Sequence, residues 1–208
     1  MKERQIINNY FQMPSLDVYN QLKTFLSEDF DELIIICPFI STKAIKKAFQ
    51  KIKKLETKKI TVVTRWRKLD IITGVSDLNV YAFLKKKKVE LMHHDKIHLK
   101  AFIKDRKYCF FGSANLTETG LGTTKNSNIE LNEISTIDKK TYLSFVKIVE
   151  DSFLIDDKFY GEMLKLKKKN IKLFNRINKI KKKFKQDLDW IEFLSPAFNR
   201  EEFMKKWL

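Results

Sequence analysis

The sequence is poor in the residues that build extended, flexible or cross-linked architectures. Among its 208 residues are 5 glycines, 3 prolines and 2 cysteines. The scarcity of Gly and Pro excludes collagen-like repeats and flexible-linker architectures. Two cysteines are too few for a zinc ribbon or a disulfide scaffold.

Acidic residues are few relative to basic ones. The 26 Asp and Glu stand against 42 Lys and Arg, which gives a formal net charge of +16 at pH 7. An excess of this size bears on partners and not on the fold. It indicates polyanions as partners, either nucleic acid or an anionic membrane surface.

Long apolar runs are missing too. The longest run covers residues 33–40, whereas a membrane-spanning helix needs about 20 apolar residues. The first residues lack the apolar centre of a secretion signal. Cys37 and Cys109 lie in apolar, strand-like segments, so we expect buried free thiols in a reducing compartment, the cytoplasm.

Hydrophobic residues make up 43% of the chain, enough to fill a core. Helical periodicity is found in residues 15–30, where Ser15 can cap the helix, after Ser41, and in 77–87 and 141–154. Strands are expected over 32–39, 59–66, 89–93, 97–104, 108–113 and 129–137. This alternation predicts an α/β architecture with a mixed sheet.

Two pairs of polar residues carry the chemistry. His98 and Lys100 are two apart on a predicted strand and therefore share a face. An imidazole beside an ammonium suits a phosphate, because one can attack phosphorus while the other neutralises its oxygens. Ser113 and Asn115 are again two apart, and they can offer a hydroxyl and an amide to the same anion. The small residues at this turn permit close approach of a phosphate.

These residues form a recognisable signature. The pattern H-x-K-x4-D followed by G-S-x-N is present at His98, Lys100, Asp105, Gly112, Ser113 and Asn115. It resembles the HKD motif of the phospholipase D-like superfamily, and the later Asn128-Ile129-Glu130 is similar to the N-x-E element of the family's tail. The resemblance covers residues 10–150 and implies an α/β/α sandwich, a mixed central sheet with helices on both faces. We therefore expect a catalytic domain over 1–152 and a lysine-rich helical extension over 153–208.

The resemblance also implies roles for these residues. His98 would be the nucleophile that forms a phosphohistidine, and Lys100, Ser113 and Asn115 would hold the phosphate, with no metal or cofactor. Glu130 would accept a hydrogen bond from the far ring nitrogen of His98, with Glu133 as the other candidate. Asp105 is odd-numbered relative to His98 and Lys100, so strand alternation gives it a structural role, as it does not share their face.

The family's chemistry needs two HKD motifs, and this chain has one. The simplest resolution is a homodimer in which two His98 side chains face each other across a two-fold axis. Similar single-motif enzymes include small nonspecific nucleases and the catalytic parts of some restriction endonucleases. The resemblance thus implies a metal-independent phosphodiesterase acting on nucleic acid, with a DNA endonuclease favoured. The alternatives are a phospholipase or phosphatidyltransferase on anionic lipid, and a catalytically idle nucleic-acid-binding module.

Further candidates surround this motif. Arg65, Trp66 and Arg67 end a predicted strand. Either the two arginines grip a nucleic-acid backbone while the indole stacks on a base, or they are surface residues beside a Trp that closes the core. His93 and His94 are expected to line the cleft mouth or cap a strand, and His94 is a further candidate for substrate contact. No distant ligand completes a metal site with these histidines, so none is expected.

The extension is strongly basic. Residues 158–185 contain 12 Lys or Arg and one acid, Glu162. A heptad seam follows Met163, Leu166, Asn170, Leu173, Ile177, Ile180 and Phe184. The seam predicts packing on the chain's own core, with pairing to the other subunit or to a partner protein as the alternative. The basic face is expected to follow a phosphate backbone.

Overall fold

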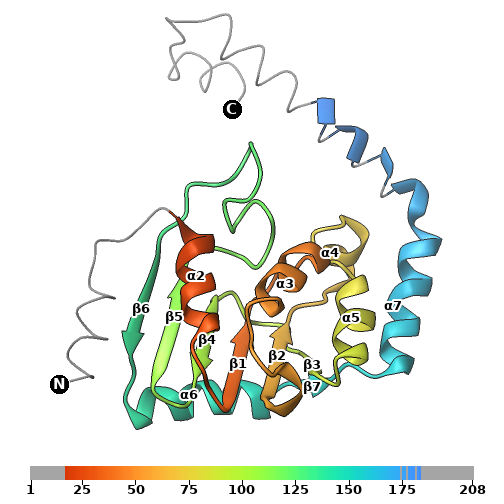
Figure 1. Ribbon diagram of the computed structural model, residues 1–208. Coiled ribbons are helices and arrows are strands. Elements are labelled where there is room, and N and C mark those ends of the chain that lie inside the picture. The colour runs from red at the N-terminus through yellow and green to blue at the C-terminus, as the bar shows by residue number, and fades with distance from the viewer. Residues whose placement is uncertain (1–16, 174, 177, 181, 184–208) are drawn as a thin grey trace, which may run out of the picture.

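The computed structural model describes residues 17–173, 175–176, 178–180 and 182–183. Its centre is a seven-stranded sheet in the order β6-β5-β4-β1-β2-β3-β7 (Figure 1). The strands are β1 (Glu32–Ile36), β2 (Lys59–Thr64), β3 (Glu90–His93), β4 (Ala101–Lys104), β5 (Tyr108–Gly112), β6 (Asn132–Thr136) and β7 (Phe153–Leu154). β2 pairs in parallel with β1 and β3, whereas the other neighbours are antiparallel. The predicted mixed sheet is confirmed.

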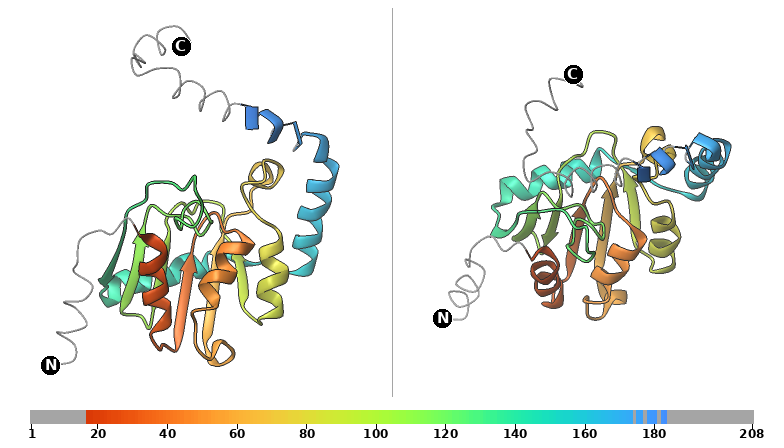
Figure 2. Two further views of the ribbon diagram at one scale, coloured as in Figure 1. Left: turned by 45° about the horizontal axis from the view of Figure 1, so that its top comes forward. Right: turned by 90° about the horizontal axis from the view of Figure 1, so that it is seen from above.

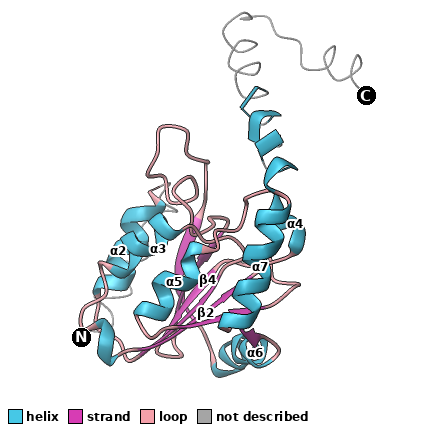
Figure 3. Cartoon of the chain, turned by 90° about the vertical axis from the view of Figure 1, so that its right-hand side faces the viewer, coloured by secondary structure: helices cyan, strands magenta, loops and turns pink. Residues whose placement is uncertain are grey.

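Helices cover both faces of this sheet, as the α/β/α expectation requires. They are α2 (Val18–Ser27), α3 (Thr42–Phe49), α4 (Lys68–Ile72), α5 (Asn79–Lys86), α6 (Lys139–Glu150) and α7 (Asp157–Lys169), with a 3₁₀ turn η1 (Leu55–Thr57). In Figure 3, α2, α3 and α5 lie on one side of the strands and α6 on the other. The view from above in Figure 2 shows the same layers, with α7 beside α5 at the end of the sheet.

The larger core lies beneath α2, α3 and α5. The buried face of α2 consists of Val18, Leu22, Phe25 and Leu26, whose spacing of three and four residues places them on one side of a helix. Each such side chain contributes about 2 kcal/mol by leaving water. The helix is capped by Asp17, whose carboxylate accepts a hydrogen bond from Asn20 N at 3.2 Å. The predicted cap, Ser15, lies outside the described residues.

The smaller core lies between the sheet and α6. Ile34, Ile36, Ile103 and Cys109 are buried there against the apolar side chains of α6, which are Tyr142, Phe145, Ile148 and Val149. In Figure 1, α6 crosses the lower part of the sheet. The packing of this face is therefore concentrated at the end of the sheet away from the loop of residues 113–131.

Two predicted boundaries move in the structure. The helix expected over 141–154 ends at Glu150, and Phe153–Leu154 instead forms β7 on the free side of β3. β7 completes the sheet, and Met163 of α7 is buried in the main core, so the first part of the predicted extension packs against the rest of the fold. The strand expected over 97–104 begins at Ala101, so the motif histidine lies in the segment that leads into β4.

The predicted long basic helix is interrupted. α7 ends at Lys169 and is followed by Asn170, whose side chain donates to Leu166 O at 2.9 Å. Residues 171–173, 175–176, 178–180 and 182–183 are again helical. The first seam residue, Met163, packs on the chain's own core, whereas Leu173 and Ile180 are about half exposed. Ile177 and Phe184 lie outside the described residues. Within the part of the chain that the structure describes, no helix is long and apolar enough to cross a membrane.

Candidate active site

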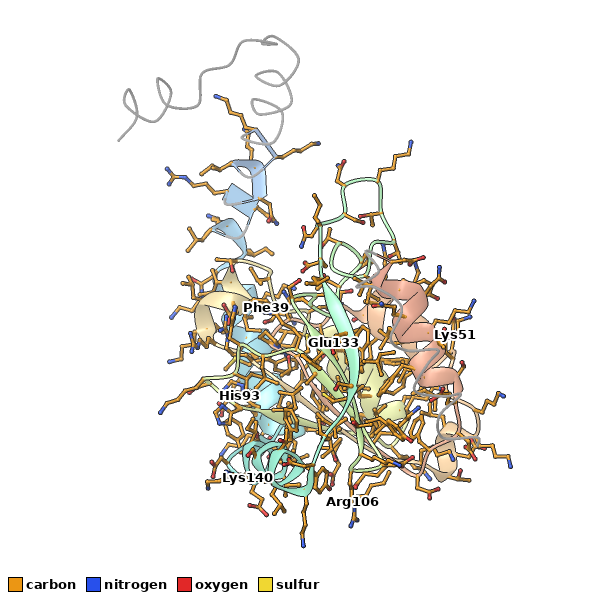
Figure 4. All side chains as sticks on the ribbon, turned by 90° about the vertical axis from the view of Figure 1, so that its left-hand side faces the viewer. Phe39, Lys51, His93, Arg106, Glu133 and Lys140 are labelled. Atoms are coloured by element: carbon orange, nitrogen blue, oxygen red, sulfur yellow. The ribbon has the colours of Figure 1, made fainter. Side chains whose placement is uncertain are left out.

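Apart from Asp105, the polar residues of the motif gather at one edge of the sheet. The carboxyl ends of β1, β2, β3 and β5 meet there with the amino ends of β4 and β6. Phe39, just after β1, lies near this upper edge in Figure 4, and Arg106, in the β4–β5 turn, lies at the lower end. Strand ends bring functional side chains together from distant parts of a sequence, as is usual in α/β folds.

His98 and Lys100 are neighbours at this edge. Lys100 Nζ lies 3.5 Å from His98 Nε2 and donates a hydrogen bond to His98 O at 2.9 Å. The imidazole is exposed and the lysine partly so. Lys100 O in turn accepts a hydrogen bond from Gly112 N at 3.3 Å, which joins this segment to the end of β5. An incoming phosphate would meet a nucleophilic ring and a cation together.

Gly112 makes the turn after β5 possible. A Cβ atom at this position would lie 2.2 Å from Leu131 O and 2.7 Å from Asn132 Cα, both backbone atoms of the neighbouring chain segment. The next residue continues this contact, since Ser113 N donates to Leu131 O and Leu131 N donates to Ser113 Oγ, both at 3.0 Å. The G-S pair of the motif thus fixes the loop against the start of β6.

Glu130 lies behind Ser113. Its buried carboxylate accepts hydrogen bonds from Ser113 Oγ and, at 2.9 Å, from Asn128 Nδ2. The hydrogen bond predicted from His98 to Glu130 is not formed among the described residues, since the carboxylate is turned to these two partners. Glu133, the other candidate, lies on β6 opposite Phe111 and is exposed.

Asn115 is held on its carbonyl side. Its Oδ1 lies 3.8 Å from Cys37 Sγ, and its backbone carbonyl is so close to Gly120 that a Cβ there would lie 2.3 Å away. Among the described residues its Nδ2 has no hydrogen-bond partner, which leaves two N–H donors for a ligand. Cys37 was expected only as a buried thiol. Its place directly after β1 is the one signal that connects it with the edge where ligands bind.

Asp105 serves the scaffold. Its Oδ1 accepts hydrogen bonds from Asp31 N at 2.8 Å and Glu32 N at 3.0 Å, at the start of β1. Its φ of 49° places it in the left-handed region that an Asp tolerates better than most residues. These contacts lie at the end of β4 opposite to His98 and join the β4–β5 turn to the central strand.

The Arg65-Trp66-Arg67 segment is engaged by the protein itself. Trp66 is 3% exposed and packs near Tyr160 of α7, so its indole closes the core and cannot stack on a base. Arg65 Nε donates to Asp70 Oδ2 at 3.0 Å, and its guanidinium lies 4.7 Å from the ring centre of Phe39. Arg67 remains exposed, and its Nε donates to Asp95 O at 2.9 Å.

The two neighbouring histidines have different environments. His93 is buried, its Nδ1 accepts a hydrogen bond from Trp66 N at 3.0 Å, and its Nε2 lies 2.9 Å from Asp95 Oδ1. Burial lowers the pKa of His93 below its ordinary value. His94 is partly exposed and accepts a hydrogen bond from Lys96 N at 3.1 Å. In the described part of the chain no group of three or more His, Cys, Asp or Glu could hold a metal ion.

The site and fold identify a class of protein. Residues 5–153 match the family described as "Cardiolipin synthase, PLD-like domain", and the chain therefore belongs to the phospholipase D-like superfamily. Membership of this family supports a phosphodiesterase-type enzyme. No curated protein sequence matches the chain.

Solved structures share the fold. NucT from Helicobacter pylori superposes with a TM-score of 0.51 at 18% sequence identity, over 67% of this chain and 91% of NucT. Nuc from Salmonella typhimurium, a phospholipase D family member, gives a TM-score of 0.51 at 14% identity, over 66% of this chain and 90% of Nuc. At these identities the likeness concerns the fold.

Proposed function

We propose that the protein is a metal-independent phosphodiesterase that cleaves nucleic acid, with DNA as the favoured substrate. The observation that carries this proposal is the pair His98 and Lys100, with Nε2 and Nζ 3.5 Å apart, beside the Asn115 amide at the same edge. Cleavage of a phosphodiester needs a nucleophile that attacks phosphorus. A cation and an amide donor then stabilise the negative charge on the phosphate oxygens. Ser113 and Glu130 support this set by fixing the loop that carries Asn115.

The proposed reaction has two steps. His98 Nε2 attacks phosphorus, a P–N bond forms, and the P–O bond to the leaving nucleotide oxygen breaks as that oxygen takes a proton from a second imidazole. Water then attacks phosphorus, gives its proton to that second imidazole, and releases His98. Lys100 and the Nδ2 of Asn115 hold the phosphate oxygens in both steps.

A second copy of the chain supplies the second imidazole in this proposal. His93 is buried and engaged on both ring nitrogens, so it is a poor proton donor to a substrate. Apolar side chains next to the active-site loop are exposed: Phe111 is 40%, Leu131 53% and Ile129 91% accessible. These three residues, the rim patch, offer an apolar surface to a second copy next to the loop of residues 113–131.

The charge of the molecule favours nucleic acid over lipid. The excess of +16 suits a polyanionic backbone. Residues 158–185, with 12 basic residues and one acid, add to the positive charge that a phosphate backbone would meet.

Cleavage in the presence of EDTA tests the proposal. The protein is incubated with DNA, with RNA and with vesicles of anionic phospholipid, each with EDTA. We expect the wild type to cleave DNA and a His98→Ala variant to be slower by about three or more orders of magnitude. A Lys140→Ala control, on the exposed side of α6, should stay active. Hydrolysis of the vesicles alone would assign the lipid alternative. Absence of all three activities in a folded protein would leave only the idle binding module.

A further inference from the structure

The loop after β1 supports the loop that carries Asn115. Ile40 and Leu116 form an isolated parallel bridge, and Ser41 N donates to Leu116 O at 2.9 Å. Ser41 Oγ also donates to Glu118, two residues further along the same loop. Two segments almost 80 residues apart in sequence are thereby joined directly beneath the site.

Cys37 lies at the centre of this junction. Its Sγ accepts a hydrogen bond from Leu116 N at 3.2 Å, and its single S–H proton faces two acceptors, Phe39 O at 3.3 Å and Asn115 Oδ1 at 3.8 Å. The side chain is fully buried. Burial raises the pKa of the thiol to about 11, so the sulfur keeps its proton and adds no negative charge beneath a phosphate.

The contact with Oδ1 has a chemical consequence for Asn115. A side-chain amide has its acceptor and its donors on opposite sides of the group. If the S–H group and the Leu116 N–H fix the loop so that Oδ1 points toward sulfur, the two Nδ2 hydrogens point away from the core. A donor that is held in the correct orientation stabilises the transition state more than a mobile one, so the loss of this orientation should lower kcat measurably.

We propose that Cys37 is a positioning residue of this enzyme, which orients the Asn115 amide toward the phosphate by hydrogen bonding on both sides of its sulfur. The inference rests on the proposed function in that Asn115 is taken to hold the phosphate. It goes beyond that function because it assigns a role to a buried thiol outside the motif.

Paired substitutions separate hydrogen bonding from packing. The Cys37→Ser variant retains a donor and an acceptor, whereas Cys37→Val fills a similar volume with neither. Cys109 provides the matched control, since it is also a buried free thiol but lies in the core on the α6 side. The activity of each variant is assayed on a small chromogenic phosphodiester and on DNA, at a temperature well below the melting temperature of every variant.

The expected result is that Cys37→Val lowers kcat about tenfold with little change in KM, that Cys37→Ser largely retains kcat, and that Cys109→Val changes neither. Amide hydrogen exchange at Leu116 gives a second readout that needs no substrate. Exchange should accelerate in Cys37→Val and not in Cys37→Ser. Unchanged exchange and unchanged kcat in Cys37→Val would overturn the inference. A wild-type protein without activity would instead refute the proposed function, and the exchange measurement would still decide the role of Cys37 in fixing the loop.

Discussion

His93 illustrates how much a single residue depends on its surroundings. Because Trp66 N donates to Nδ1, the neutral ring must carry its proton on Nε2, which faces Asp95 Oδ1. The ring also lies against Phe153 and Phe159, with centroids 4.8 and 5.7 Å away. Protonation of Nδ1 would place two N–H donors, that of Nδ1 and that of Trp66, opposite each other without an acceptor. His93 therefore serves packing between β3 and the start of α7.

The lowered pKa of His93 predicts acid sensitivity. The unfolded chain binds a proton on this ring near its ordinary pKa of 6.5, whereas the folded protein binds it only at lower pH. The free energy of unfolding should therefore fall as the pH drops below about 6.5 and continue to fall until the lower pKa of the folded state. A His93→Asn variant retains an acceptor for Trp66 N and does not titrate. Its melting temperature should decline less than that of the wild type between about pH 8 and 5.

A Ser144→Asn variant is the control for this measurement. Ser144 is exposed on α6, far from His93, and has no titratable group, so its replacement should leave the wild-type slope of melting temperature against pH. If the His93→Asn and wild-type curves run parallel, the titration of His93 does not contribute to stability.

At this scale the sequence predicted the residues whose neighbours are local. His98 and Lys100 are two apart, and the structure does bring their side chains together. The sequence could not connect Cys37 with the site or decide between the two alternatives for Trp66. Each depends on a partner far along the chain, Leu116 in one case and Tyr160 in the other.

Among the elements, helices with a cap and an apolar stripe were predictable. α3 begins after Ser41, whose Oγ accepts from Ala44 N at 3.2 Å, as the sequence indicates. β7 was missed because its two residues have exposed side chains and no alternation, so only the free edge of β3 makes them a strand. Residues 97–100 were also predicted as strand, but they lie beyond the last residues of β1 that pair with β4. They therefore form the segment that leads into β4.

Gly112 offers a test of the contact between β5 and β6. A methyl group there would meet Leu131 O at 2.2 Å, and backbone cannot move aside as a side chain can. Gly112→Ala should therefore destabilise the fold by about 3 kcal/mol or more. Gly161→Ala is the matched control, since nothing lies within 4 Å of its added Cβ and helix propensity should stabilise α7 by up to about 1 kcal/mol. Urea denaturation measures both, and a Gly112→Ala variant as stable as the wild type would refute the close approach.

On the scale of the whole molecule, the charge is unevenly distributed. Residues 158–185 hold 12 of the 42 basic residues, and α7, where this stretch begins, packs on the core beside α5. The extension is therefore joined to the catalytic fold at one end. The sequence predicted packing of the seam on the chain's own core, and this holds for its first residue, Met163, whereas Leu173 and Ile180 are about half exposed.

The rim patch carries the prediction about assembly. Leu131→Asp should convert the proposed dimer to a monomer in sedimentation and reduce DNA cleavage in parallel, because a charged carboxylate opposes burial of an apolar surface. Leu143→Asp is the control, since this residue is equally exposed at 51% but lies on the outer side of α6. An active monomer would contradict the use of two His98 side chains, whereas an intact, active Leu131→Asp dimer would place the interface elsewhere.

The most direct test of the central claim is to trap the covalent intermediate. The protein is mixed with labelled DNA in EDTA and quenched in alkali, in which a phosphohistidine survives, and the label is mapped by mass spectrometry. The account predicts a nucleotide adduct on His98 that forms before product is released and is absent from His98→Ala. Full cleavage without an adduct on His98, or an adduct that persists in His98→Ala, would contradict it.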